Sequence, residues 1–123
     1  MFDVAFNGII TANRGDSFSF PIVLNIGNSL NVERFPMDEN CRVYFSVMEP
    51  NQSFEDALIR KVYTVDDTDE NGDIVVSFKP KDTQCVLPGK YYYQVKLKVT
   101  DKLDDTKYDV YTIIDKTLFF ITE

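Results

Sequence analysis

The sequence contains no histidine and no tryptophan, and its only cysteines are Cys41 and Cys85. Histidine is the side chain that most often acts as a general base near neutral pH, and it also activates catalytic thiols. Its absence predicts a protein that is not an enzyme, with no catalytic residue and no cofactor. Thiols in a reducing compartment are usually small, unpaired side chains, so we expect no disulfide between the two cysteines.

Positive charge is also scarce. The chain has 13 Lys and Arg residues against 20 Asp and Glu residues, which gives a formal net charge of -7 at pH 7. Nucleic-acid binding depends on lysines and arginines that neutralise phosphates, so we expect no nucleic-acid partner. Lysines do recur over residues 90–107, but they alternate with apolar residues. That spacing is typical of the solvated face of one strand rather than of a binding patch.

Long hydrophobic runs are missing as well. No apolar stretch approaches the roughly 18 residues that a membrane-spanning helix needs. No basic segment followed by an apolar run opens the sequence either. We therefore expect no secretory signal, no membrane partner, and synthesis and folding in the cytoplasm.

Apolar and aromatic residues, in contrast, are well supplied. Hydrophobic residues make up 44% of the 123 positions, and 10 Phe and 7 Tyr residues are spread along the chain. A chain of this length buries about two-thirds of its unfolded surface and forms one domain. We expect residues 1–123 to fold as a single domain around a substantial core.

Apolar residues recur with a period of two along most of the chain, which predicts strands and no convincing helix. Residues 41–48 give the clearest pattern, because every second residue from Cys41 is apolar. Further strands are expected at residues 18–24, 57–65, 73–79, 90–99, 108–114 and 118–121. We expect the last of these to pair with the N-terminal segment.

The segments between the expected strands are of two kinds. Residues 1–10 predict one broken leading strand, whereas residues 25–40 predict a long polar connection with few apolar anchors. Asn71-Gly72 is a strong signal for a tight hairpin turn. We therefore expect residues 57–65 to pair antiparallel with residues 73–79.

Residues 78–99 organise the predicted fold. A polar connection leads through Leu87, Pro88 and Gly89 into a long strand that begins near Tyr91. In an immunoglobulin-like sandwich the chain crosses between sheets at such a point, and a tyrosine early in the next strand hydrogen-bonds back to the crossover backbone. We expect Tyr91 to be this corner tyrosine, with Tyr93 as the alternative, and Leu87 to be an apolar plug. The predicted fold class is all-β, an immunoglobulin-like antiparallel β-sandwich of about 7–8 strands.

Residues 66–73 match the first half of a calcium-binding loop. The candidate metal ligands are Asp67, Asp69, Asn71 and Asp73. The position where such a loop needs a bidentate glutamate is Phe78, so a solvated hairpin tip is favoured over a weak ion site. Arg14-Gly15-Asp16 matches a cell-adhesion tripeptide, but here too a plain turn between two strands is the favoured interpretation.

Aromatic residues are more numerous than one small sandwich readily hides. The interface candidates are Phe2, Phe6, Phe35, Phe119 and Phe120, with Tyr44, Tyr63, Tyr92 and Tyr111 also on outward faces of the expected strands. Exposed aromatics are favoured at protein interfaces, which indicates self-association or docking on a larger assembly. The alternative is that loops cover both faces of some strands.

Several segments together resemble one known group of proteins. They are the Arg-Gly-Asp-Ser turn into Phe-Ser-Phe at residues 14–20, Pro80-Lys81-Asp82-Thr83, the run from Leu87 to Tyr93, and a closing Val-Tyr-Thr-Ile-Ile at residues 110–114. In this order they resemble the small immunoglobulin-like domains of tailed-bacteriophage virion proteins. These include the N-terminal domain of baseplate upper proteins and stand-alone head-decoration or head-fibre proteins.

The resemblance implies a non-enzymatic virion structural protein that acts through contacts with other virion proteins. The expected partners are the major capsid protein or fibre and baseplate components, and the chain is expected to be a homo-oligomer or present in many copies. It would be located in the host cytoplasm during assembly and then in the virion. Because no coiled-coil or receptor-binding extension follows the sandwich, we expect a capsid-attached accessory protein.

Two alternatives remain open. One is an adaptor domain of the tail or baseplate. The other is a carbohydrate- or calcium-dependent binding module that uses the loops at residues 27–40 and 66–73.

Overall fold

The structure is a computed structural model that describes residues 2–4, 8–28 and 31–123. The fold is nearly all-β, with 52% of residues in strands and 6% in helices. The strands are β1 (Asp3–Val4), β2 (Ile10–Asn13), β3 (Phe18–Ile22), β4 (Asn25–Asn28), β5 (Asn31–Arg34), β6 (Cys41–Met48), β7 (Ile59–Tyr63), β8 (Ile74–Phe78), β9 (Gly89–Thr100) and β10 (Tyr108–Thr122). The two short helices are η1 (Val65–Asp67) and α1 (Pro80–Thr83).

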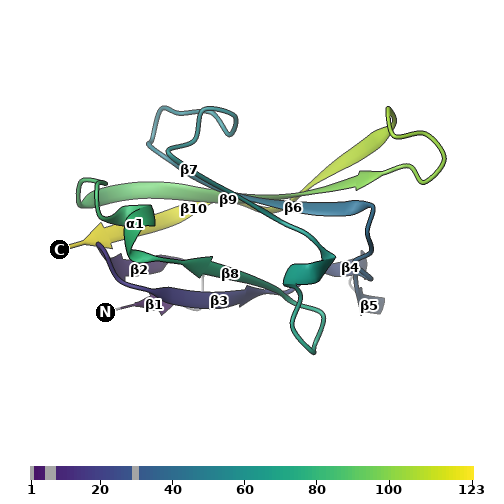
Figure 1. Cartoon of the computed structure of the whole chain (residues 1–123), viewed down its shortest axis with the longest axis horizontal. Coiled ribbons are helices and arrows are strands. Elements are labelled where there is room, and N and C mark those ends of the chain that lie inside the picture. Colours follow the sequence, from purple (N-terminus) through teal and green to yellow (C-terminus); the bar gives the residue numbers. More distant parts are fainter. Residues whose placement is uncertain (1, 5–7, 29–30) are drawn as a thin grey trace.

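The main sheet is mixed and curled. Its strand order is β1-β2-β10-β9-β6-β7, and smaller sheets pair β3 with β8 and β4 with β5. Figure 1 shows β10, β9, β6 and β7 in one layer, while β1 and β2 lie beside β3 and β8 in the opposite layer. The six-stranded sheet therefore bends around from one layer into the other.

This topology corrects the predicted fold in one respect. The all-β class is confirmed, but the strands do not form a purely antiparallel sandwich of seven or eight strands. The end of β10 pairs with β2 in parallel, with Phe119 opposite Ile10. Register shifts between Thr112 and Thr117 interrupt the regular ladder of β10 with β9. Both halves of β10 pair with β9, and only the second half also pairs with β2. The expected pairing of the closing segment with the N-terminal segment is confirmed.

The predicted hairpin between residues 57–65 and 73–79 is wrong. Strand β7 pairs with β6 in the main sheet, whereas β8 pairs with β3. Between them, the Thr64 hydroxyl and the Asp67 carboxylate accept each other's backbone amides in a capping box that starts η1. Asn71-Gly72 does form a turn, with Gly72 at a φ of 83°. That turn leads from η1 into β8, so it does not join two long partners.

Two other segments differ from expectation. Residues 3–4 and 10–13 form an antiparallel pair of short strands, β1 and β2, rather than one broken strand. The expected polar connection at residues 25–40 contains the β4–β5 pair. Neither short pair has the sustained alternation that marks the longer strands, because each strand has at most four residues.

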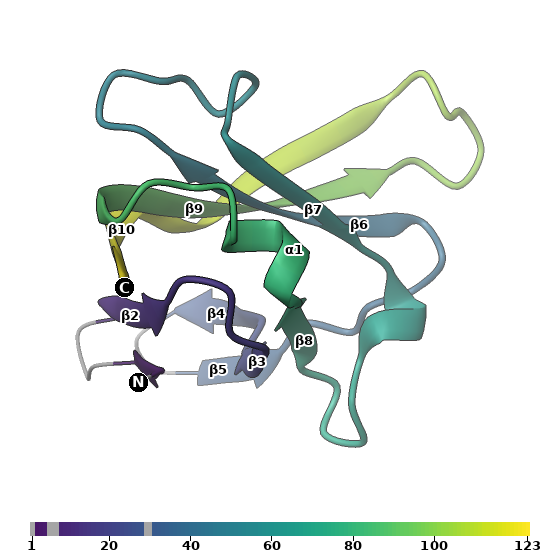
Figure 2. The same ribbon diagram turned by 60° about the vertical axis from the view of Figure 1, so that its left-hand side comes forward.

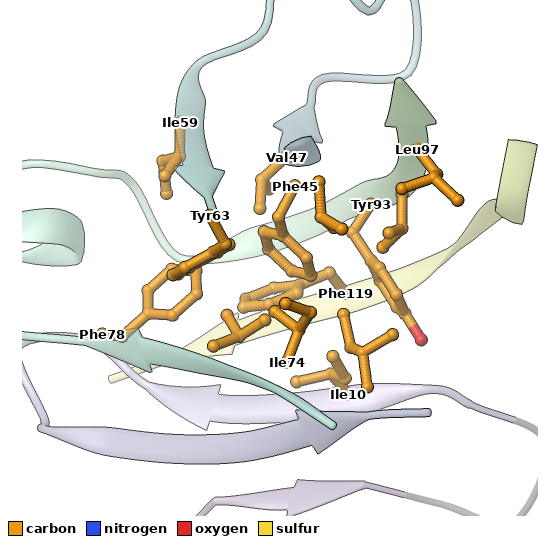
Figure 3. Close-up of a cluster of buried hydrophobic side chains, with 14 of the residues drawn as sticks. Ile10, Phe45, Val47, Ile59, Tyr63, Ile74, Phe78, Tyr93, Leu97 and Phe119 are labelled. Carbon is orange, nitrogen blue, oxygen red and sulfur yellow. The ribbon is translucent and has the colours of Figure 1, made fainter. Parts of the chain in front are cut away.

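Aromatic rings cross the core from one layer to the other (Figure 3). Phe78 lies 4.7 Å from Phe18 and 5.8 Å from Phe45 between ring centroids, and Phe45 lies 5.5 Å from Tyr93. Phe119 joins this cluster from β10 and is fully buried. Stacked and edge-on aromatic pairs add packing energy beyond the area they bury, so this cluster ties the layers together.

Both cysteines are free; Cys41 is buried in the core and Cys85 is exposed. None of the helices that the structure describes has the length and apolar character needed to cross a membrane.

Candidate functional site

The crossover from β8 to β9 carries the contact that the sequence predicted for a tyrosine corner. The chain leaves β8, forms α1 and enters β9 on the other layer (Figure 2). The Tyr91 hydroxyl donates a hydrogen bond to the carbonyl of Leu87. Burial raises the pKa of Tyr91, with a smaller contribution from the charge of Glu49, so the hydroxyl keeps its proton for this bond.

The other predicted corner residues have different roles. The Tyr93 hydroxyl donates to the carbonyl of Gly8 and so ties β9 to the segment before β2. Leu87 is 76% exposed and is no apolar plug; the side chain packed on the core at this point is Val86. Pro88 and Gly89 are exposed and complete the turn into β9. The corner residues of the crossover are therefore structural.

An ion pair and a hydroxyl fasten α1 to both layers. The Lys61 ammonium of β7 lies 3.0 Å from the Asp82 carboxylate, which also accepts the backbone amide of Lys79 at 2.7 Å. Burial opposes ionisation of Asp82, but these two bonds outweigh it and hold the pKa of the carboxyl below its usual 3.8. The fully buried Thr83 hydroxyl accepts the amide of Gly15 at 2.8 Å. Sequence reasoning missed these contacts, because they join elements far apart in the chain.

The Arg14-Gly15-Asp16 segment is a turn with structural partners. Arg14 donates its backbone amide to the carbonyl of Thr122, and its guanidinium lies 3.2 Å from the Glu123 carboxylate. Gly15 has a φ of 82°, a conformation that favours glycine. The favoured interpretation as a turn agrees with this geometry.

The acidic segment at residues 66–73 uses its carboxylates to shape turns. Asp67 accepts the backbone amide of Thr64, and Asp69 accepts the amides of Asn71 and Asp73. Asp73 is buried. Within the described residues, no group of three or more His, Cys, Asp or Glu is arranged to hold a metal ion. The four candidate ligands therefore are not brought together as a calcium site.

The structure changes the set of interface candidates. Phe119 is 0% exposed, so its place among surface aromatics was wrong; the parallel pairing of β10 with β2 turns it into the core. Tyr63 is also buried, since it stands opposite the buried Val43 on the core side, and its hydroxyl accepts the amide of Ser77 across the layers. Phe2 packs on the core and stacks on Phe18 at 4.5 Å. Phe35 and Phe120 are partly buried, and Phe6 lies outside the described residues.

The β9–β10 hairpin carries much of the exposed apolar surface. It projects beyond the rest of the molecule in Figure 1, drawn in light green and yellow. At its tip Leu103 is 98% exposed, and along β10 the exposed apolar residues are Tyr108, Val110 and Tyr111. Tyr111 stands opposite Leu97 on the core side of the hairpin, whereas Tyr108 and Val110 stand opposite Thr100 and Lys98 on its outer side.

A groove opens beneath this hairpin, between the two layers. Its volume is 370 Å³, and its lining residues are Leu24, Asn25, Phe35, Leu97, Val99, Tyr111 and Ile113. All but Asn25 contribute apolar or aromatic side chains. The groove lies on the face of the hairpin that carries Tyr111, and Tyr108 and Val110 lie on the opposite face. We call the groove and the exposed apolar residues on the two faces and tip of the hairpin the hairpin surface.

Of the residues in the hairpin surface, the sequence singled out Phe35 and Tyr111 and missed Leu103, Tyr108 and Val110. Tyr111 stands directly opposite Leu97 across the hairpin, which turns its ring toward the groove. The signal for Leu103 was present, since it is the one apolar residue in the polar run at residues 101–107. A leucine in such a loop has no core to enter and must lie at the surface.

The fold and the hairpin surface define a small all-β protein whose described residues offer apolar contact surface and no cluster of reactive groups. Comparison with protein-family models, with curated proteins and with solved structures found no match to this chain.

Proposed function

We propose that this chain is a non-enzymatic structural protein of a tailed-bacteriophage virion, an immunoglobulin-like β-sandwich attached to the capsid as a decoration or head-fibre protein. It acts through contacts with neighbouring virion proteins and is present in many copies. The resemblance over residues 14–20, 80–93 and 110–114 motivates the virion assignment.

The single observation that carries a contact-making role is the hairpin surface. Leu103 at 98% exposure would cost free energy in water unless a partner covers it, because apolar area contributes about 25 cal/mol per Å² when buried. Interfaces concentrate aromatic residues at their centre, and β10 exposes one on each face, Tyr111 at the groove and Tyr108 on the outer side.

The corner supports the immunoglobulin-like part of the proposal. Tyr91 binds the crossover backbone four residues upstream, as the tyrosine of such a corner does. The parallel pairing of β2 with β10 is compatible with this class, because a closing strand can turn to meet the first strand at the edge of a sandwich.

Virion composition tests the proposal. Virions of the phage that encodes the chain, purified by density gradient, are analysed by quantitative mass spectrometry with the major capsid protein as the internal standard. We expect the chain in fixed ratio to the capsid protein. A copy number relative to the capsid protein as low as that of a tail protein would indicate a position in the tail or baseplate. Absence of the chain from intact virions would overturn the proposal.

A point substitution tests the surface. Leu103→Asp at the hairpin tip should reduce incorporation into virions, whereas Leu87→Asp, at an exposed leucine of the crossover, should not. Equal incorporation of both variants would remove the hairpin surface from this role.

A further inference from the structure

On the side away from the core, the part of the main sheet formed by β6, β7 and β9 carries basic and no acidic side chains, although the protein is acidic. Asp115 of β10 accepts the side-chain amide of Gln94 on this side. Arg42 of β6 stands directly opposite Lys98 of β9, and Tyr44 stands opposite Lys96. Arg60 of β7 stands opposite Ser46 on the same face. We call this surface of β6, β7 and β9 the basic face. Its cations are Arg42, Arg60, Lys96 and Lys98, on a chain whose net charge is -7.

Among the described residues, no carboxylate forms an ion pair with the cations of the basic face. Within the part of the chain that the structure describes, the ion pairs of other residues are those of Arg14, Lys61 and Lys102, and none involves Arg42, Lys96 or Lys98. Like charges directly opposite on neighbouring strands destabilise a sheet. The Arg42 and Lys98 pair therefore costs stability that one acidic residue at either position would relieve.

Aromatic rings hold two of these lysines in place. The Lys96 ammonium lies 4.6 Å from the centre of the Phe54 ring, and that of Lys98 lies 4.3 Å from the Tyr108 ring. Cation–π contacts orient an ammonium without neutralising it. The charges are thus positioned, and they remain available to an anion.

Loops border the basic face on two sides. Figure 1 shows the connection at residues 49–58 and the tip of the β9–β10 hairpin both rising from the layer of β6, β7 and β9, on the side away from β3 and β8. Between them, Val62 stands opposite Tyr44. Val62 is an exposed aliphatic side chain among the cations. Tyr and Arg are enriched in protein-binding hot spots, and this face carries both in Tyr44 and Arg42.

We propose that the basic face binds an acidic segment of a partner protein, with carboxylates against Arg42, Lys96 and Lys98 and an aromatic or aliphatic side chain against Tyr44 and Val62. A nucleic acid fits less well, because a long polyanion would be repelled by the remaining negative charge of the protein. This inference rests on the proposed function in one respect: both take the partner of this chain to be another protein. Virion composition and binding at this face are measured separately, so either can fail alone.

Binding to a random copolymer of glutamate and tyrosine tests this inference, followed by fluorescence anisotropy of the labelled copolymer. We expect saturable binding that weakens as salt rises, since charge contacts at a surface are screened over about 8 Å at physiological ionic strength. The double variant Arg42→Glu with Lys98→Glu should bind at least about tenfold more weakly. The matched control, Lys79→Glu with Lys81→Glu at α1, changes the net charge equally and should bind as the unmodified protein does.

The single variant Arg42→Glu supplies a second readout. It places an acidic group opposite Lys98, so it should raise the thermal midpoint while it weakens copolymer binding. Lack of copolymer binding, equal loss in the Lys79 and Lys81 control, or tighter binding to an oligodeoxythymidine of the same charge would each overturn the inference. An Arg42→Glu variant that is less stable than the unmodified protein would contradict the repulsion on which it depends.

Discussion

Replacing Tyr91 by phenylalanine removes one hydroxyl from the corner and leaves the ring in place. The Tyr91 side chain is 6% exposed, so the ring continues to fill its site between the layers. The carbonyl of Leu87 loses its only side-chain donor in the described residues. A lost hydrogen bond with a partly buried partner left behind costs about 1 to 2 kcal/mol.

Urea unfolding followed by tyrosine fluorescence or circular dichroism measures this loss. With an m-value near 1.5 kcal/mol/M, which is typical of small domains, the midpoint should fall by about 0.7 to 1.3 M while the slope stays unchanged. The matched control is Tyr92→Phe, on the next residue of β9, whose hydroxyl has no hydrogen-bond partner among the described residues. That change should alter the free energy of unfolding by less than about 0.5 kcal/mol. If both variants unfolded at the same urea concentration, Tyr91 would not be the residue that secures the crossover.

Three further substitutions test other contacts of the fold. Burial raises the pKa of Tyr63 from 10.0 to about 12, so this tyrosine ionises at lower pH in the unfolded chain than in the folded protein. The free energy of unfolding therefore falls as the pH rises from 10 toward 12. Tyr63→Phe should reduce that fall by up to about 2 to 3 kcal/mol, measured by urea unfolding at each pH. The pKa of Asp82 lies below 3.8, so its ion pair with Lys61 stabilises the fold above that pH and is lost as the pH falls through the folded pKa. Asp82→Asn should therefore cost about 1 kcal/mol at pH 7 and less at pH 3, and a constant difference would contradict the ion pair. Gly15→Ala should cost about 1 kcal/mol from its φ of 82° alone, since no atom lies within 4 Å of the added Cβ; a neutral result in thermal unfolding would show that the turn relaxes.

Strands with sustained alternation could be predicted from the sequence. The prediction for residues 41–48 matches β6 residue for residue, and that for residues 90–99 differs from β9 only at its ends. These strands lie at the centre of the main sheet, where one face meets the core along the whole strand. Every second residue of such a strand is then buried, so apolar and polar residues alternate along it and the strand can be recognised in the sequence.

Pairing partners were harder to predict, because they depend on contacts between distant residues. The turn at Asn71-Gly72 gave a strong local signal for a hairpin. In the structure η1, which starts at the capping box of Thr64 and Asp67, separates β7 from β8, and the two strands belong to different sheets. The pairing of the closing segment with the N-terminal segment was predicted, but its parallel direction was not, because it joins residues more than a hundred positions apart and no local pattern specifies that direction.

The candidate site was predictable only in part. Phe119 and Tyr63 were placed at the surface because aromatics look surplus when burial is judged strand by strand. The pairing of β10 with β2 buries Phe119, and the register of β7 with β6 puts Tyr63 opposite the buried Val43 on the core side. For the basic face, the sequence predicted that the lysines of β9 lie on a solvated face. Only the register of β9 with β6 reveals that Arg42 stands directly opposite Lys98.

The parallel pairing of β2 with β10 also determines how the protein bears mechanical load. Four consecutive residue pairs, from Ile10 with Phe119 to Asn13 with Thr122, run in the same direction, and the bond from Arg14 to Thr122 extends them. A pull from the segment before β2 against the end of β10 slides these strands past each other. All of their hydrogen bonds are then strained together in shear, instead of opening one at a time as in a peeled hairpin. A chain tethered through both of these segments would therefore resist extension at this pair of strands before its core is exposed.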